Sequence, residues 1–233
     1  MISAEEKLQV ENYLISKKLS LDILLEVKDH MISQIEDKMK DDKIGFEEAF
    51  LKVELSWRDN FSLTKYWFFS GHERIPKFVK EMMKRRLNPL IFKSIILGFL
   101  YQLISVLLVF FIVSEAYYKI AFLTINYVMF ILAISVLIIY LVKKKWYDRK
   151  YKEVSFTLFQ RNLAWLVPGI LSAAQLLNYS KYQWAYFRTN IDSSLVNVAI
   201  GMGCRFLIYS YVLLSLFIFF EHKKALKKLQ FLN

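Results

Sequence analysis

The stretch SIILGFLYQLISVLLVFFIVS, Ser94 to Ser114, decides the fold of this chain because it holds 21 consecutive residues without a charge. A helix needs about 20 apolar residues to cross a hydrocarbon layer roughly 30 Å thick. A second uncharged run of 23 residues extends from Ile120 to Val142. The two runs predict membrane-spanning helices at about 94–114 and 120–142. The composition of the 233-residue chain, 56% hydrophobic and 17% aromatic, agrees with a protein that lies largely in lipid.

Two further runs predict spans of less regular sequence. Residues 162–180 carry no charge but contain Pro168, where we expect a kink. Ser193 to Phe220 is interrupted only by Arg205 and predicts a span at about 196–220. The predicted fold class is therefore all-α, with a four-helix transmembrane bundle within residues 90–222. A small three-helix cytoplasmic domain and a basic amphipathic interfacial helix precede this bundle.

The distribution of Lys and Arg predicts the orientation, because cations near span ends stay on the cytoplasmic side. One side of the predicted spans carries 17 of these residues: Lys77, Lys80, Lys84, Arg85, Arg86, Lys93, Lys143, Lys144, Lys145, Arg149, Lys150, Lys152, Arg161, Lys223, Lys224, Lys227 and Lys228. The other side carries three: Lys119, Lys181 and Arg188. We therefore expect both termini in the cytoplasm, a basic tail at 223–233, and a multi-pass protein of the cell (inner) membrane. Six aromatic residues at span ends are expected to form belts at the lipid headgroups: Tyr117, Tyr118, Trp146, Tyr147, Tyr182 and Trp184.

Residues 73–89 predict a separate amphipathic helix between the cytoplasmic domain and the first span. Its apolar residues follow helical spacing: Ile75, Phe78, Val79, Met82 and Met83. Pro76 suits the first helical turn, and we expect Asn88-Pro89 to end the segment. A basic helix of this kind can lie in the inner headgroup layer, the favoured interpretation, or pack onto the soluble domain.

Residues 1–72 hold ten Lys or Arg against fourteen Asp or Glu, a net charge of −4, whereas residues 73–233 hold 22 against seven, a net of +15. The overall charge of +11 thus belongs to the half with the apolar runs, and we expect it to face anionic lipid and not nucleic acid. Three helices are expected in the acidic part, near 4–18, from Ser20 to about Asp41, and over FEEAFLKVELSW. Ser20 is the expected N-cap of the second helix.

The second helix holds the first set of candidate functional residues, in the stretch LLEVKDHMISQIED at Leu24 to Asp37. On a helical wheel, Glu26 and Asp29 lie opposite the apolar face and His30 lies at its border. Glu26 and His30 are four residues apart and can touch, but a zinc site needs three or four ligands. We therefore interpret Glu26, Asp29 and His30 as a surface that is solvated or faces a partner, with no metal, cofactor or catalysis expected there.

The spacing of Glu26, Asp29-His30, Phe46, Ala49-Phe50 and Trp57 resembles the helix-turn-helix-associated alpha-helical signalling domains of bacterial membrane proteins. The resemblance covers roughly residues 5–60. It implies a signalling or adaptor role, often beside a transcriptional regulator, and it implies no catalytic residues.

Within the predicted spans, Arg205 is the most costly residue, with Glu115 and Gln175 as further polar candidates. Arg205 can reach the outer surface with its long side chain, pair with Glu115 or Asp192, or line a polar pathway. Gln175 is expected to form hydrogen bonds between helices.

Two functional hypotheses follow. The first is a signalling or adaptor protein whose cytoplasmic domain binds a protein partner of unknown identity. The second is a small transporter or permease subunit that uses the polar residues in the spans. The sequence leaves a homo-oligomer open. We expect no enzyme, because the chain lacks motifs such as G-x-S-x-G and H-E-x-x-H.

Overall fold

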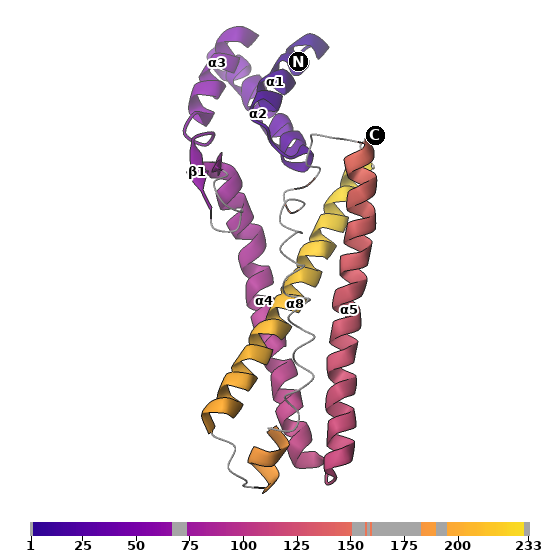
Figure 1. Ribbon diagram of the computed structural model, residues 1–233. Helices are drawn as coiled ribbons and strands as arrows, with labels where there is room; N and C mark the ends of the chain where they lie inside the picture. Colours follow the sequence, from indigo (N-terminus) through magenta and orange to yellow (C-terminus); the bar gives the residue numbers. More distant parts are fainter. Residues whose placement is uncertain are drawn as a thin grey trace. The chain divides into compact units, whose positions relative to one another are not determined.

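The computed structural model describes residues 2–66, 74–150, 157, 159, 183–189 and 195–230 (Figure 1). The chain divides into two compact units. The N-terminal unit contains Met1–Arg86 with Tyr151–Asn162 and Glu221–Asn233, and the apolar unit contains Leu87–Lys150 and Leu163–Phe220. Each unit is described by itself.

The N-terminal unit contains the three predicted helices. They are α1 (Ala4–Ser16), α2 (Leu21–Asp42) and α3 (Phe46–Trp57). Helix α1 begins in a capping box, in which the Ser3 hydroxyl accepts from the Glu6 amide and the Glu6 carboxylate accepts from the Ser3 amide. Ser20 is the N-cap of α2 as predicted, but its side chain makes no capping hydrogen bond. Asp22 instead accepts the amide of Ile23 at 3.0 Å.

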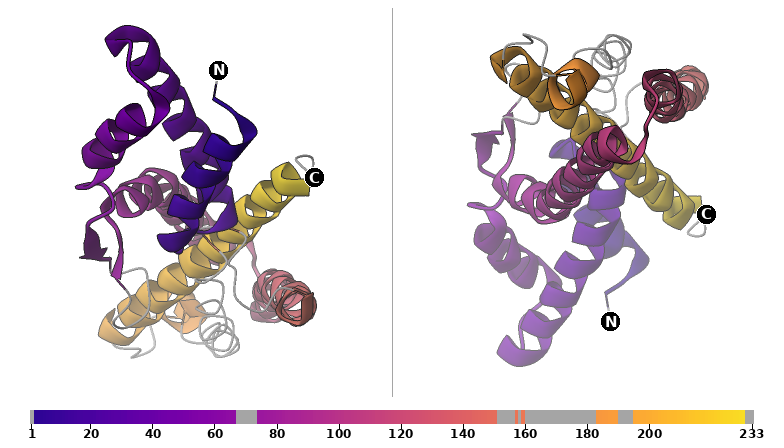
Figure 2. Two further views of the ribbon diagram at one scale, coloured as in Figure 1. Left: turned by 90° about the horizontal axis from the view of Figure 1, so that it is seen from above. Right: turned by 90° about the horizontal axis from the view of Figure 1, so that it is seen from below.

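The three helices pack side by side around one core (Figures 1 and 2). The apolar residues predicted for α3 are all buried: Phe46, Ala49, Phe50, Val53 and Trp57. On α2 the buried face is rotated from the predicted one, because this helix packs against both α1 and α3. Ile23 and Val27 are buried there, whereas Leu25 and Ile32, which lie on the apolar face of the helical wheel, are only partly buried.

Two short antiparallel strands, β1 (Leu63–Lys65) and β2 (Arg74–Pro76), were not predicted. Their register pairs Thr64 with Ile75. Ile75 and Pro76 therefore belong to β2, and the helix that was expected to include them begins at Lys77. Three-residue strands lie below the length at which alternating hydrophobicity identifies a strand, so the sequence offered little indication of them.

Helix α4 (Lys77–Phe111) continues through Pro89 without a break, so the predicted end at Asn88-Pro89 is wrong. Proline removes one backbone hydrogen bond. The helix tolerates this loss and continues into the apolar run that begins at Ser94. Residues 73–89 are thus not a separate linker helix.

The first turns of α4 belong to the N-terminal unit, and their apolar side packs against other residues of that unit. Val79 and Met83 are buried, and the ring of Phe78 lies 5.7 Å from that of Trp57 and 5.4 Å from that of Phe61. This face was expected in the headgroup layer. The structure instead corresponds to the alternative, a helix packed onto the soluble domain.

The apolar unit is built from the long helices α4, α5 (Glu115–Lys150) and α8 (Leu195–Gln230), with the short π-helix η3 (Ala185–Thr189). Among the described residues, three helical segments are long and apolar enough to cross a membrane: Lys77–Phe111, Glu115–Ile139 and Leu195–Lys227. They contain most of the predicted spans at 94–114, 120–142 and 196–220. The predicted span at 162–180 lies outside the described residues.

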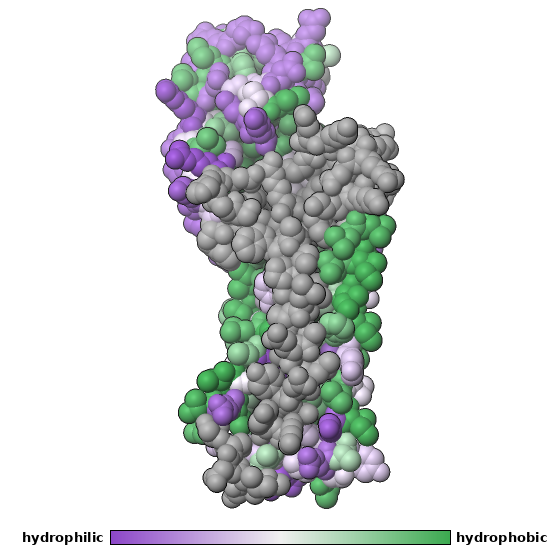
Figure 3. Space-filling view, in the orientation of Figure 1, coloured by the Kyte–Doolittle hydropathy of each residue, from purple (hydrophilic) through white to green (hydrophobic). Residues whose placement is uncertain are grey.

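The surface of helices α1–α3 differs in polarity from the surface of the long helices α4, α5 and α8. In Figure 3, hydrophilic side chains gather over α1–α3, whereas apolar side chains cover the exposed sides of the long helices. Phe99, Ile104 and Ile131 are each more than half exposed. Such a contiguous exposed apolar surface is costly in water and is expected of helices that contact lipid.

Candidate functional site

The first candidate site is the exposed face of α2 in the N-terminal unit. Glu26, Asp29 and His30 are all exposed, as the helical wheel predicted. Glu26 is already engaged within the unit, because Arg86 Nη2 donates to its carboxylate at 2.9 Å. A second carboxylate, that of Asp22, lies 3.9 Å from Arg86 Nη1. Asp29 makes no ion pair with the residues that the structure describes, so its charge faces solvent.

His30 is held by its neighbours although its side chain is exposed. Its ring packs edge-on against Trp57 at 6.1 Å, and its Nε2 lies 3.5 Å from the amide nitrogen of Gln34. The Trp57 indole N–H donates to Gln34 Oε1 at 2.7 Å. Within the described ranges, no three His, Cys, Asp or Glu side chains come together as metal ligands would. The arrangement resembles a recognition surface more than a reactive centre.

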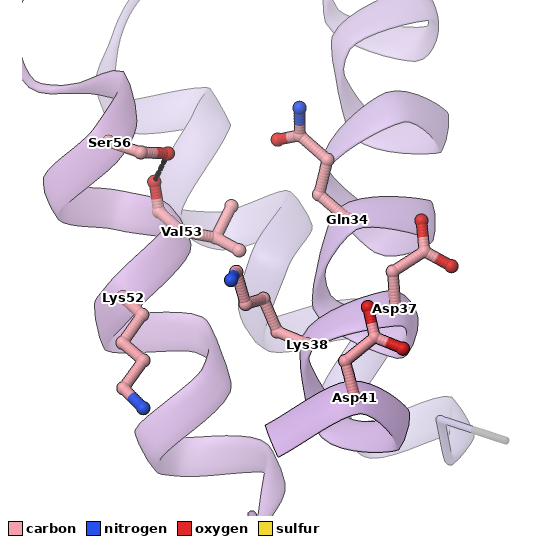
Figure 4. Close-up of a pocket in the computed structure, with 7 residues that line it drawn as sticks. All are labelled: Gln34, Asp37, Lys38, Asp41, Lys52, Val53 and Ser56. Atoms are coloured by element: carbon pink, nitrogen blue, oxygen red, sulfur yellow. Dashed lines mark hydrogen bonds between the residues drawn. The ribbon is translucent and has the colours of Figure 1, made fainter.

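An open groove of about 240 Å³ continues this surface between α2 and α3 (Figure 4). Its lining residues are Gln34, Asp37, Lys38 and Asp41 from α2 with Lys52, Val53 and Ser56 from α3. Lys52 forms ion pairs with Asp42 at 3.2 Å and Glu48 at 3.3 Å, and hydrogen bonds to these carboxylates raise the pKa of Lys52. The Ser56 hydroxyl donates to the Val53 carbonyl at 2.7 Å and is therefore occupied. The groove presents charges and one apolar patch, without a nucleophile beside a base.

The second candidate site surrounds Arg205 on α8 in the apolar unit. Arg205 is 1% exposed, so the first of the three alternatives, a side chain that reaches the outer surface, does not occur. Its Nη2 donates to Gln183 Oε1 at 2.6 Å, and its Nε lies 3.4 Å from the Gly201 carbonyl. The guanidinium carbon lies 5.0 Å from the centre of the Phe122 ring, a cation–π contact.

Several polar side-chain atoms on α4 and α5 are buried without a hydrogen-bond partner in the described structure. They are the hydroxyls of Ser105 and Tyr118 and both amide atoms of Gln102. Gln183 connects this group to Arg205, because its Nε2 contacts the Ser105 carbonyl at 3.4 Å. The Tyr118 ring packs on Phe122 at 5.9 Å and on Trp184 at 5.2 Å. We call Gln102, Ser105, Tyr118, Gln183 and Arg205 the buried polar cluster.

A neighbouring set of polar residues is fully paired. The Tyr209 hydroxyl donates to Asn126 Oδ1 at 2.6 Å, and Asn126 Nδ2 donates to the Phe122 carbonyl at 2.7 Å. The Tyr101 hydroxyl donates to the Ile125 carbonyl at 2.5 Å, and its ring lies 4.4 Å from that of Tyr209. These bonds tie α4, α5 and α8 together and contrast with the unpaired atoms of the cluster.

Of the other intramembrane candidates, the structure describes Glu115. Glu115 is exposed in the first turn of α5, where a negative charge complements the helix dipole. Gln175 and Asp192 lie outside the described residues.

Sequence reasoning missed most of the cluster. Tyr118 and Trp184 were assigned to an aromatic belt, but they are 0% and 7% exposed and pack against each other inside the unit. Tyr117 is 71% exposed, as a belt residue would be, and the side chains of Trp146, Tyr147 and Tyr182 lie outside those that the structure describes. The sequence does contain one relevant pattern, because Gln102 and Ser105 are three residues apart and must share one face of a helix.

Arg188 in η3 has a role that the sequence did not suggest. It donates to the carbonyls of Val109 at 2.8 Å, Phe110 at 2.6 Å and Ile112 at 3.2 Å. Its guanidinium also lies 5.7 Å from the Trp184 ring. A helix end leaves its last carbonyls without backbone partners, so Arg188 serves as the C-terminal cap of α4.

Comparisons with protein-family models, curated proteins and solved structures found no match to this chain.

Proposed function

We propose that this protein is a multi-pass membrane protein whose N-terminal unit lies in the cytoplasm and binds a protein partner, in a signalling or adaptor capacity. The observation that carries the proposal is the exposed face of α2. Its apolar side closes a core with α1 and α3, while Glu26, Asp29 and His30 remain on the surface. The sequence resemblance to signalling domains of the same helical pattern supports the same role.

The surrounding contacts make this face suitable for recognition. Trp57, Gln34 and His30 hold one another through the 2.7 Å hydrogen bond and the ring contact, so the central part of the face is ordered before a partner arrives. A preordered surface loses less conformational entropy on binding. Asp29 supplies an unpaired charge, which favours a partner with a complementary cation.

The test is site-specific photocrosslinking in cells with the full-length chain. A photoreactive residue at Ser33, which is exposed on the same face of α2, should give a discrete crosslinked product. The product should disappear when Asp29→Ala and His30→Ala are combined. A photoreactive residue at Leu8 on α1, 56% exposed, is the matched control and should not give that product. An unchanged product in the double variant would contradict the assignment of the α2 face.

A second candidate function, transport of a small solute, is favoured by the burial of Arg205 among polar side chains of the apolar unit. A cation inside a membrane-spanning bundle is costly, and such residues commonly mark ion or substrate pathways. Under this alternative, Arg205→Leu would abolish a flux measured in vesicles while the protein still inserts. A variant that inserts and transports like the wild type would reduce Arg205 to a structural role.

A further inference from the structure

The buried polar cluster contains more hydrogen-bonding capacity than its own residues use. The Ser105 side chain is 1% exposed, that of Tyr118 is 0% exposed and that of Gln102 is 7% exposed, and none of their polar side-chain atoms has a partner in the described structure. In the interior of a membrane-spanning unit, each unpaired polar group costs several kcal/mol. Buried polar groups in native proteins are paired, so these atoms call for a partner beyond the residues that the structure describes.

The atoms at this place favour a negatively charged occupant. Ser105 and Tyr118 supply hydroxyl donors, and Gln102 supplies an amide donor. Arg205 adds a fixed positive charge to the same cluster while it keeps its hydrogen bond to Gln183 at 2.6 Å. Charge-assisted hydrogen bonds from such donors are about twice as strong as neutral ones and are strengthened further in a low dielectric.

The scaffold around these donors is rigid. Phe122 contacts both Arg205 and Tyr118, and Trp184 packs on the other side of Tyr118 at 5.2 Å. The paired residues Asn126 and Tyr209 fix α5 to α8 at 2.6 Å. The donors are therefore held in place before binding, which lowers the entropic cost of capturing a small ligand.

We propose that the buried polar cluster binds a small free anion, such as chloride or formate, with the Ser105 and Tyr118 hydroxyls, the Gln102 amide and Arg205 as its ligands. This inference does not depend on partner binding by α2. It specifies the class of ligand that the transport alternative would handle, and it assigns a binding site even if no flux exists.

The test measures thermal unfolding of the purified full-length protein in uncharged detergent by far-UV circular dichroism. Sodium chloride or sodium formate is titrated against sodium gluconate, whose anion is too large for the cluster, at constant ionic strength. Above the Kd, each tenfold rise in a bound anion should raise the midpoint by roughly 3–5 °C for a chain of this size. Potassium in place of sodium should change nothing.

Two conservative variants test the assignment of the site. Ser105→Ala and Tyr118→Phe each remove one unpaired hydroxyl and little volume, so their midpoints in gluconate should equal or exceed that of the wild type. Their response to chloride should be reduced at least tenfold in apparent affinity. Ser215→Ala is the matched control. Ser215 lies on α8 and is buried like Ser105, but its hydroxyl donates to the Tyr211 carbonyl at 2.8 Å. This variant should respond like the wild type.

Three results would overturn the proposal. One is a wild-type midpoint that does not distinguish chloride and formate from gluconate. Another is an undiminished response in both Ser105→Ala and Tyr118→Phe. The third is a midpoint that rises only when anionic phospholipid is added, which would place a lipid headgroup at the cluster instead. Loss of the crosslink at the α2 face would leave this inference untouched, so the two proposals fail separately.

Discussion

Replacement of Gly98 by alanine tests the packing of α4 against α8. A Cβ atom built on Gly98 would lie 2.2 Å from Ser210 Oγ, 3.0 Å from the Ser210 amide nitrogen and 3.1 Å from its Cα. Real Cβ atoms essentially never approach such atoms closer than 3.0 Å, so the first contact is 0.8 Å too short. The hydroxyl can rotate away, but the backbone contacts can be relieved only if the two helices separate.

The size of the effect follows from a comparison of two variants. Overpacking of this kind costs about 1–3 kcal/mol. Alanine also gains up to about 1 kcal/mol over glycine in helix propensity, which partly hides the cost. Gly203→Ala in α8 provides the reference, because a Cβ there meets nothing within 4 Å. The difference between Gly98→Ala and Gly203→Ala isolates the packing cost and should be about 1–3 kcal/mol.

The assay is reversible unfolding of the full-length protein from mixed micelles by dodecyl sulfate, followed by circular dichroism. Combining Ser210→Ala with Gly98→Ala should recover the part of the lost stability that the contact with the hydroxyl causes. The part that the backbone contacts cause should remain. A difference below about 0.5 kcal/mol between the two glycine variants lies within ordinary non-additivity and would refute the close approach of the helices.

Three other predictions concern individual contacts. Arg188→Ala should lower the free energy of unfolding in the same assay by about 1.5–3 kcal/mol, because the carbonyls of Val109, Phe110 and Ile112 lose a charged donor, and Arg188→Lys should restore part of it. Gln34→Leu should destabilise the N-terminal unit by about 1–3 kcal/mol, measured by urea titration followed by tryptophan fluorescence, because the Trp57 indole N–H loses its acceptor. Hydrogen bonds to the carboxylates of Asp42 and Glu48 raise the pKa of Lys52 in the folded protein. The ion pairs of Lys52 therefore stabilise the fold fully below the ordinary lysine pKa, and this stabilisation is lost as the pH rises through the raised pKa of the folded protein. Lys52→Met should therefore flatten the alkaline end of the stability profile, and an unchanged profile would show that the ion pairs contribute nothing.

The N-terminal helices could be predicted from the sequence because their local patterns agree with their packing. Phe46, Ala49, Phe50, Val53 and Trp57 occupy one helical stripe, and all five are buried. The exposure of Glu26, Asp29 and His30 followed from the same geometry. The exact buried face of α2 could not be predicted in this way. It depends on the positions of the two neighbouring helices, which no local pattern contains.

The error at Pro89 has a physical cause. Proline commonly marks a helix end in water, where freed backbone groups can bond to solvent. Proline does not always end a helix, and α4 continues for 35 residues with Pro89 inside. Ile75 and Phe78 were also assigned incorrectly, because both fit the pattern of an amphipathic helix. Ile75 instead belongs to β2, and Phe78 packs on Phe61 within the N-terminal unit.

The buried polar cluster was the least predictable part. Arg205 could be recognised as costly from its position in an apolar run, but its partners come from other segments of the chain. Gln183 is 22 residues away in sequence and Phe122 belongs to α5. Composition cannot distinguish an exposed aromatic residue, such as Tyr117, from the adjacent Tyr118, which lies in the interior.

The most direct test of the central claim, a multi-pass membrane protein with its N-terminal unit in the cytoplasm, is cysteine labelling in intact cells. The native Cys204 is first replaced by serine, and single cysteines are placed at Leu63, 62% exposed in the N-terminal unit, or at Tyr117, 71% exposed at the start of α5. A membrane-impermeant thiol reagent should label Tyr117→Cys in intact cells and Leu63→Cys only after the membrane is opened. Labelling of Leu63→Cys in intact cells, with Tyr117→Cys protected, would contradict the account.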